Sequence, residues 1–235
     1  MDVIIFDLET TGIPNTTGTV TKEIVDFRGV KKLEKKSYHV KGEPIQFSAL
    51  VCDLDTLKIK KIINFYTMPS EPICDEARIA SHGITNEEIV KLSKKKHLED
   101  LLFENYPEIF NDDGKLFISY NIKFDREVLV NSLARYNAYL DMGTEIRVGD
   151  RVRKSLIYNF CAMKAVQSIL GLPRSIKLKD ALIKLNLDKD VDSLFNSFLV
   201  KIGVNDYNAK FHDGLYDTFC TWYILVNLKD KLWNT

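Results

Sequence analysis

Two carboxylates near the start of the chain have a spacing that suits metal chemistry. Asp7 and Glu9 are two residues apart at the end of a mainly apolar segment, residues 2–9, that predicts a β-strand. Because side chains alternate along a strand, both carboxylates belong to the same face. The run is apolar on both faces, which is typical of a central strand in an α/β sheet, and ligands gather beyond the carboxyl ends of such strands. The sequence therefore predicts a ligand site at the end of this strand.

Three further groups complete a set that could hydrolyse a phosphodiester. Asp125 follows a predicted strand at 116–120, and His212 and Asp217 lie at the start of the last predicted helix. Four carboxylates repel one another unless cations bind, and all-oxygen ligands favour Mg²⁺ or Mn²⁺ over zinc. We therefore expect a site for two divalent cations, which together activate a water and stabilise the leaving oxygen. A histidine beside such a site is a candidate general base.

Neighbouring residues have less specific roles. The turn at 10–12, Thr10-Thr11-Gly12, offers backbone N–H groups that could hold a phosphate or a sugar. Asp213 is expected to cap the last helix, because aspartate is a preferred N-cap residue. For His82 two interpretations stay open: it either closes a turn between two helices or contacts the substrate.

The remaining pattern predicts the elements that position these groups. Strands are expected at 2–9, 45–53, 57–66, 116–120 and 156–160, and helices at 75–111 in short pieces, 122–139, 162–170, 178–185 and 213–232. This order predicts an α/β fold in which a mixed sheet of about five strands is flanked by helices. We expect a single domain over residues 1–235, with two insertions at about 13–44 and 187–211.

Composition excludes several classes of protein. The 235 residues are 45% hydrophobic and 28% charged, which argues against intrinsic disorder, and the longest apolar runs are too short to span a membrane. No secretory signal is visible, so a cytoplasmic location is expected. The four cysteines form no C-x-x-C pair, which argues against a zinc ribbon or a disulfide framework. The net charge is zero, but residues 22–42 carry an excess of four positive charges.

Three motifs resemble those of a known family. Asp7-Leu8-Glu9-Thr10-Thr11-Gly12, then Asn121-x-x-Phe124-Asp125, then His212 with Asp217 five residues later resemble the exonuclease motifs of the DnaQ-like DEDD superfamily. The tyrosine branch of that superfamily would need a tyrosine at position 213, which is Asp, so the chain resembles the histidine (DEDDh) branch. The segments 46–51 and 81–85 are also similar to the family. The resemblance implies an RNase H-like fold, two divalent cations (Mg²⁺ or Mn²⁺) and 3′-to-5′ hydrolysis that releases nucleoside monophosphates.

The resemblance also implies a role for each matched residue. The metal ions would be held by Asp7, Glu9, Asp125 and Asp217, and His212 would be the general base. The terminal nucleotide would be contacted by Thr10, Thr11 and Gly12, with His82, Asn121 and Phe124 nearby. Tyr120 stands where the family often has histidine, and the insertion at 13–44 sits where a substrate strand would enter.

The favoured function is a 3′-to-5′ exonuclease acting on single-stranded 3′ ends. A DNA proofreading or repair type, similar to the proofreading subunit of bacterial replicative DNA polymerase, is preferred, with a polymerase or replication protein as a candidate partner. RNA trimming or degradation of short oligonucleotides stays open within this class. The alternatives outside it are a non-catalytic module that binds nucleic acid or protein through the basic insertion, and an endonuclease or integrase that makes internal cuts.

Overall fold

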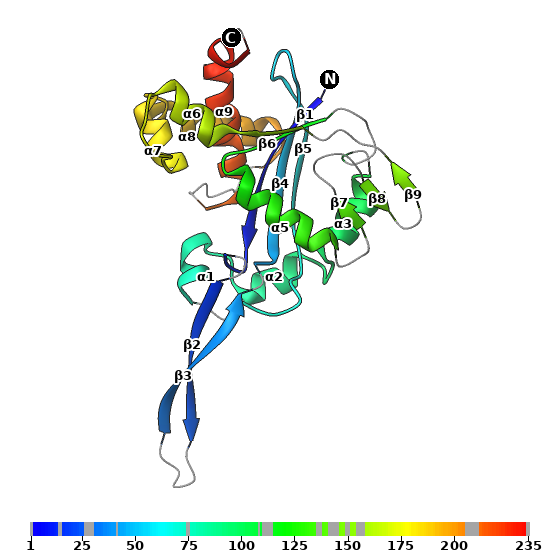
Figure 1. Ribbon diagram of the computed structural model, residues 1–235, viewed down its shortest axis with the longest axis vertical. Coiled ribbons are helices and arrows are strands. Elements are labelled where there is room, and N and C mark those ends of the chain that lie inside the picture. Colours follow the sequence, from blue (N-terminus) through cyan, green and yellow to red (C-terminus); the bar gives the residue numbers. More distant parts are fainter. Residues whose placement is uncertain are drawn as a thin grey trace.

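A mixed five-stranded sheet forms the centre of the molecule (Figure 1). The computed structural model describes residues 2–13, 16–25, 31–40, 42–73, 76–107, 109, 115–134, 138–140, 146–148, 151–153, 158–204 and 212–233. The sheet consists, in spatial order, of β10 (Tyr158–Cys161), β6 (Leu116–Ser119), β1 (Asp2–Thr10), β4 (Pro44–Asp53) and β5 (Ile59–Tyr66). β1 pairs parallel with β6 and antiparallel with β4, so the predicted mixed sheet is confirmed.

The alternation of side chains along β1 divides the core into two layers. Val3 and Ile5 are buried on one face, against α6 (Ala162–Ile169), α7 (Leu178–Lys184), α8 (Asp188–Lys201) and α9 (Gly214–Trp233). Ile4, Phe6 and Leu8 are buried on the other face, against α3 (Leu98–Asn105) and α5 (Ile122–Ala134). Figure 1 shows α6–α9 gathered together and α5 crossing the sheet. β1 is therefore covered on both sides, as its apolar sequence predicts.

Two short helices close the end of the sheet at which β1 finishes. α1 (Glu76–His82) and α2 (Asn86–Leu92) are joined by a tight turn, and α2 starts with a capping box. In this box Thr85 Oγ1 accepts from Glu88 N at 3.2 Å, and Glu88 Oε2 accepts from Thr85 N at 2.8 Å. Ile84 and Ile89 pack with Ile45 in a small apolar cluster. This cluster holds the α1–α2 pair beside the ends of β1 and β4.

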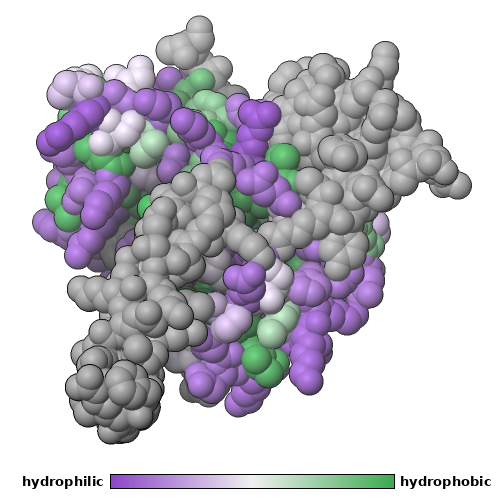
Figure 2. Space-filling view, turned by 60° about the horizontal axis from the view of Figure 1, so that its bottom comes forward, coloured by the Kyte–Doolittle hydropathy of each residue, from purple (hydrophilic) through white to green (hydrophobic). Residues whose placement is uncertain are grey.

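The surface of the described part is mostly hydrophilic on the side drawn in Figure 2, with small separate apolar patches. Some large apolar side chains are exposed, such as Val200 at 66%, as is ordinary on a protein surface. Among the described helices, none has both the length and the apolar character needed to cross a bilayer.

Two sequence predictions need correction. The helix predicted at 122–139 ends at Ala134, and Ala138–Leu140 forms β7, which pairs antiparallel with β8 (Ile146–Val148). β8 pairs in turn with β9 (Arg151–Arg153). Helical spacing in the sequence continues past Ala134. The backbone of β7 nevertheless pairs with β8, which begins six residues further on. The helical spacing of a segment does not reveal such a pairing.

The second correction concerns residues 187–211, which were expected to be an inserted connector. Residues 188–201 instead form α8, which buries Val191, Phe195 and Leu199 in the main core layer. These three residues are four apart and form one helical face. The length of the segment suggested an insertion, although its period is that of a core helix. Residues 205–211 lie outside the described part.

The other expected insertion, at 13–44, contains a separate hairpin. β2 (Thr16–Val25) and β3 (Lys31–Val40) pair antiparallel, from Thr16 opposite Val40 to Val25 opposite Lys31. In Figure 1 this hairpin projects beyond α1 and α2, away from the central sheet.

Replacement of Phe195 tests whether α8 belongs to the core. Phe195 is fully buried and its ring lies 5.1 Å from the rings of Tyr216 and Phe219 on α9. We expect Phe195→Ala to lower the free energy of unfolding by about 3–5 kcal/mol in chemical denaturation. Val200→Ala, on the exposed side of the same helix, is the control and should cost less than about 1 kcal/mol. Equal losses in the two variants would contradict a core position for α8.

Candidate active site

Most of the residues that the motifs single out meet in one pocket of about 310 Å³. The end of β1, the start of α5 and the start of α9 form it, with α1 at the side. Its lining includes the predicted residues Asp7, Glu9, Thr10, Gly12, His82, Asn121, Phe124, Asp125, His212 and Asp217. Thr11 is not part of this lining, because its hydroxyl accepts a hydrogen bond from Glu43 N at 3.0 Å. Residues from three distant parts of the sequence are thus brought together.

Asp125 is held by the turn between β6 and α5. Asn121 O accepts from Phe124 N at 2.9 Å, which starts the helix, and Ser119 Oγ accepts from Asn121 N at 3.2 Å. The Ser119 hydroxyl also hydrogen-bonds to the Asp125 carboxylate, and the backbone N–H of Leu8 donates to the same group. The spacing between Asn121 and Asp125 therefore fixes the carboxylate against β1.

The start of α9 is docked on β4 through a close contact at Gly214. Gly214 N donates to Gln46 Oε1 at 3.1 Å, and Thr218 Oγ1 donates to Ser48 O at 3.3 Å. A Cβ added at Gly214 would lie 2.8 Å from Ser48 Oγ. Asn64 Oδ1 accepts hydrogen bonds from both Ser48 Oγ and Gln46 Nε2, so these side chains have little freedom to move aside. Glycine is therefore required where α9 meets the sheet.

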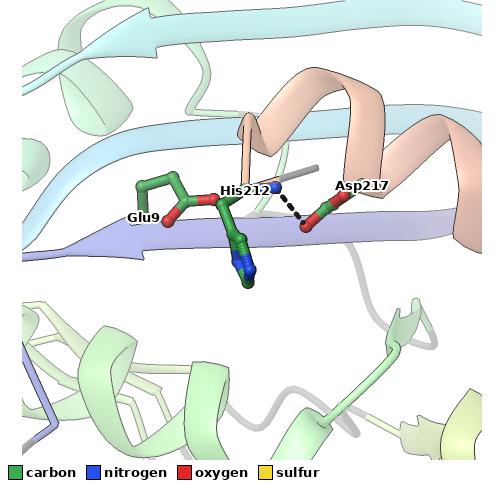
Figure 3. A group of neighbouring side chains, drawn as sticks. All are labelled: Glu9, His212 and Asp217. Carbon is green, nitrogen blue, oxygen red and sulfur yellow. Dashed lines mark hydrogen bonds between the residues drawn. The ribbon is translucent and has the colours of Figure 1, made fainter. Parts of the chain in front are cut away.

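This docking places His212 and Asp217 beside Glu9 (Figure 3). His212 N donates to Asp217 Oδ2 at 3.2 Å, and one side-chain atom each from Glu9, His212 and Asp217 lie within 4.8 Å of one another. His212 has a φ of +66°, a left-handed conformation that costs energy in a residue other than glycine. Asp213 Oδ1 accepts from Leu215 N and Tyr216 N at 3.0 and 3.3 Å, which confirms the predicted helix cap.

The carboxyl groups of the pocket lie in an environment that disfavours their ionised form. Burial raises the pKa of Asp7 and of Glu9 well above the usual range, and the charges of neighbouring carboxylates raise them further. Burial also raises the pKa of Asp125 and of Asp217 to about 7 each. A bound cation would remove this cost, because it would favour the ionised form of every carboxylate near it.

A hydrogen-bond acceptor in the pocket is ready to bind such a cation. Asp217 Oδ1 is buried and has no hydrogen-bond partner among the residues that the structure describes. A buried acceptor without a partner is costly unless a ligand satisfies it. The surrounding donor set consists mainly of carboxylate oxygens, which suit a hard divalent cation. The residues present therefore fit a metal site.

A family model described as RNase_T exonuclease matches residues 4–225, nearly the whole chain. The chain belongs to this exonuclease family. Membership confirms the DEDD-type exonuclease family that the motifs predict and implies that divalent metal ions take part. No curated protein sequence matches this exonuclease.

Solved structures share the fold at low sequence identity. The zinc-bound complex of E. coli ExoI with single-stranded DNA matches with a TM-score of 0.61 and 16% identity, over 98% of this exonuclease and 41% of ExoI. The nuclease domain of 3′hExo, a DEDDh family member bound to rAMP, matches with a TM-score of 0.56 and 15% identity, over 98% and 92% of the two chains. Exonuclease X in complex with 5′ overhanging duplex DNA matches with a TM-score of 0.53 and 15% identity, over 98% of this exonuclease and 92% of Exonuclease X. The exonuclease thus spans about two fifths of the ExoI chain, and the RNase H-like fold is confirmed.

The structure adds detail for three residues at or near the site. His82 Nδ1 accepts from Ile84 N at 3.0 Å, so His82 closes the α1–α2 turn and also lines the pocket. Tyr120, at the position of the family's frequent histidine, donates from its hydroxyl to Ile176 O at 2.9 Å and braces the neighbouring loop. Lys177 was not singled out, because no motif includes it. Burial lowers the pKa of His212, and the charge of Lys177 lowers it further. Both effects favour the neutral imidazole.

The raised carboxyl pKa values predict how the stability of the metal-free exonuclease depends on pH. The folded state keeps protons on Asp125 and Asp217 up to about pH 7, whereas the unfolded chain releases them near pH 4. The free energy of unfolding in EDTA should therefore fall as pH rises from about 4 to 7, by about 1.4 kcal/mol for each pKa unit of each group. Saturating Mn²⁺ should reverse the trend, because it binds the ionised carboxylates.

Thermal unfolding between pH 5 and pH 8, with EDTA or with Mn²⁺, measures this dependence. Asp217→Asn is the matched control: it keeps the shape of the side chain, removes one titrating group and should flatten the EDTA profile. A melting temperature that rises with pH in EDTA would contradict raised pKa values of Asp125 and Asp217 in the folded state.

Replacement of Gly214 tests the docking of α9. We expect Gly214→Ala to lower stability by about 1–3 kcal/mol through overpacking against Ser48, although alanine is the better helix former. The Mn²⁺-induced rise in melting temperature should shrink as well, because His212 and Asp217 move with the helix. The double variant Ser48→Ala with Gly214→Ala removes the nearest atom and should recover part of both losses relative to Ser48→Ala. Additive losses in the double variant would contradict the close approach of Gly214 to Ser48.

Proposed function

We propose that this exonuclease hydrolyses single-stranded 3′ ends in the 3′-to-5′ direction and releases nucleoside 5′-monophosphates, using two divalent cations, Mg²⁺ or Mn²⁺. The observation that carries the proposal is the meeting of four carboxylates and His212 in a single pocket at the carboxyl end of β1. Family membership supports exonuclease chemistry, and the histidine supplies a base that a purely acidic metal site would lack.

The residues of the pocket have distinct roles in this proposal. Asp7, Glu9, Asp125 and Asp217 hold the cations, which when bound supply charge stabilisation for the attacking water and the leaving oxygen. His212, kept neutral by burial and by Lys177, accepts a proton from the attacking water on its imidazole. The water oxygen forms a bond to phosphorus, and the bond from phosphorus to the 3′ oxygen of the preceding nucleotide breaks. That oxygen keeps the electron pair and takes up a proton.

The remaining lining positions the terminal nucleotide. Thr10 Oγ1 donates to Gly12 O at 2.9 Å and so shapes the turn that borders the pocket. Phe124 and Asn121 come from the start of α5 and present an aromatic ring and an amide to a base or sugar. A pocket of about 310 Å³ is at the small end of the range for ligand sites, which suits one nucleotide.

A second groove of about 550 Å³ continues from the catalytic residues. It shares Tyr120, His212 and Asp217 with the pocket and extends along residues 175–179, where Lys177 and Lys179 stand. In the proposed reaction this groove takes the phosphates next to the scissile bond, which are negatively charged and match the two lysines.

We favour DNA of the proofreading or repair type as the substrate, with a polymerase or replication protein as partner and the cytoplasm as location. The E. coli ExoI structure contains single-stranded DNA and the Exonuclease X structure duplex DNA, which supports DNA. The 3′hExo structure contains rAMP, which keeps RNA trimming as the second candidate. We also propose that residues 1–235 form a single catalytic domain.

A gel time course on 5′-labelled single-stranded DNA and the matching RNA tests the reaction. With Mg²⁺ or Mn²⁺ we expect products that shorten by single nucleotides, faster on DNA. Asp7→Asn should slow hydrolysis at least about 100-fold, since a metal site contributes several kcal/mol to the transition state. Faster shortening of RNA than of DNA would favour RNA trimming. Internal cuts would favour an endonuclease. A substrate that stays intact under every metal condition would favour a binding module.

His212→Ala separates the base from the metal ligands. We expect kcat to fall by about 100-fold to 10⁴-fold, as for loss of a general base, while the Mn²⁺-induced rise in melting temperature stays. Asp217→Asn should reduce both quantities. If His212→Ala abolished the Mn²⁺-induced stabilisation, His212 would be a metal ligand and not the base.

A further inference from the structure

The β2–β3 hairpin leaves the body of the molecule beside the proposed active site, at a neck formed by Thr11 and Glu43. Thr11 N donates to Glu43 O at 2.8 Å, and Glu43 N donates to Thr11 Oγ1 at 3.0 Å, so the chain departs and returns at hydrogen-bonded positions. The buried Glu43 carboxylate accepts from Ser70 N at 2.8 Å, which fixes the neck to the body. Gly12 and Ile13, directly before the hairpin, line the catalytic pocket. The ribbon therefore begins at the mouth of the site.

The hairpin is long and stands apart from the core. Each strand has ten residues, which corresponds to a reach of about 33 Å at 3.3 Å per residue. Among the described elements, β2 and β3 make their main contacts with each other, and Figure 1 shows them projecting past α1 and α2. An isolated two-stranded ribbon is marginally stable in water, which favours a partner that stabilises it.

The sequence of the two strands is basic on both faces. They carry five lysines, at 22, 31, 32, 35 and 36, against two glutamates, at 23 and 34. The pairing register places Lys22, Lys32 and Lys36 on one face with Glu34, and Lys31 and Lys35 on the other with Glu23. Neither face carries a continuous apolar row between positions 20–25 and 31–36, so the ribbon is poorly suited to an apolar protein surface. Its charge instead matches a polyanion.

We propose that the β2–β3 hairpin is a nucleic-acid-binding arm that contacts the phosphates of the substrate upstream of its 3′ terminal nucleotide. The inference rests on the proposed function, because it is the reacting end of the polymer that lies in the pocket at the neck. A reach of about 33 Å is long enough to follow several consecutive nucleotides of a single strand. The arm should therefore strengthen binding of long substrates and leave the shortest ones unaffected.

Two variants test the arm, one by removing it and one by neutralising its charge. The first joins Ile13 directly to Gly42, which leaves Gly12-Ile13-Gly42 as a three-residue loop between the paired residues Thr11 and Glu43. The second keeps the hairpin and changes all five of its lysines to glutamine. The matched control changes five exposed lysines elsewhere to glutamine: Lys91, Lys184, Lys189, Lys201 and Lys231.

Binding is measured without hydrolysis, by fluorescence anisotropy of a 5′-labelled 20-mer in EDTA over a range of salt concentrations. We expect both arm variants to raise Kd at least about 10-fold at low salt and to reduce the salt dependence, by about 0.7 in the log–log slope for each phosphate that the arm no longer neutralises. The control variant should keep at least half of the wild-type affinity. Unchanged Kd and slope in the five-glutamine arm variant would overturn the proposal, and so would an equal loss of affinity in the control.

Hydrolysis of a trimer and of the 20-mer then locates the effect. The arm variants should lose kcat/KM at least about 10-fold on the 20-mer and keep the wild-type value on the trimer. An equal loss on both lengths would overturn the proposal, because the hairpin would then support the active site itself. If the wild-type protein cleaves neither length, the proposed function fails, whereas the anisotropy measurement still decides whether the arm binds nucleic acid.

Discussion

The burial of several carboxyl groups side by side at the end of β1 is the constraint on which the rest of the structure depends. Burial raises the pKa of Asp7 and of Glu9, and the charges of Asp125 and Asp217 raise both further, so the metal-free fold disfavours the ionised form of these groups. The two core layers and the docking of α9 hold them together. The fold thus carries the cost of bringing these carboxyl groups together in advance, which is the usual condition for a preorganised electrostatic site.

This cost explains the number of specific hydrogen bonds and packing contacts that surround so small a pocket. Ser119 and the N–H of Leu8 support Asp125, the N–H of His212 supports Asp217, and Asn64 steadies the β4 side chains against which Gly214 packs. Each of these interactions limits the movement by which a carboxylate could escape its neighbours. The strained backbone of His212 belongs to the same arrangement, since its left-handed conformation places the residue between Glu9 and Asp217.

The parts of the molecule that could be predicted from sequence are those governed by local periodicity or by a motif. Strand alternation predicts the two core layers, with Val3 and Ile5 in one and Ile4, Phe6 and Leu8 in the other. The residue type of Asp213 predicts the helix cap. β7 could not be predicted because it is only three residues long and follows a helical spacing without a break, and α8 was obscured by the length of its segment. Lys177 acts on His212 only through the tertiary fold, so no spacing in the sequence could indicate it.

The neck between Thr11 and Glu43 makes the hairpin an exchangeable part of the enzyme. Since the ends of the inserted segment are already held together by hydrogen bonds, closing a longer or shorter loop there changes the chain entropy only slowly with length. Relatives of this chain could therefore gain, lose or lengthen such a ribbon by simple insertion or deletion while Asp7 and Glu9 keep their geometry. If the hairpin binds the polymer as proposed, the length of polymer that the enzyme holds can then evolve separately from the geometry of the carboxyl groups.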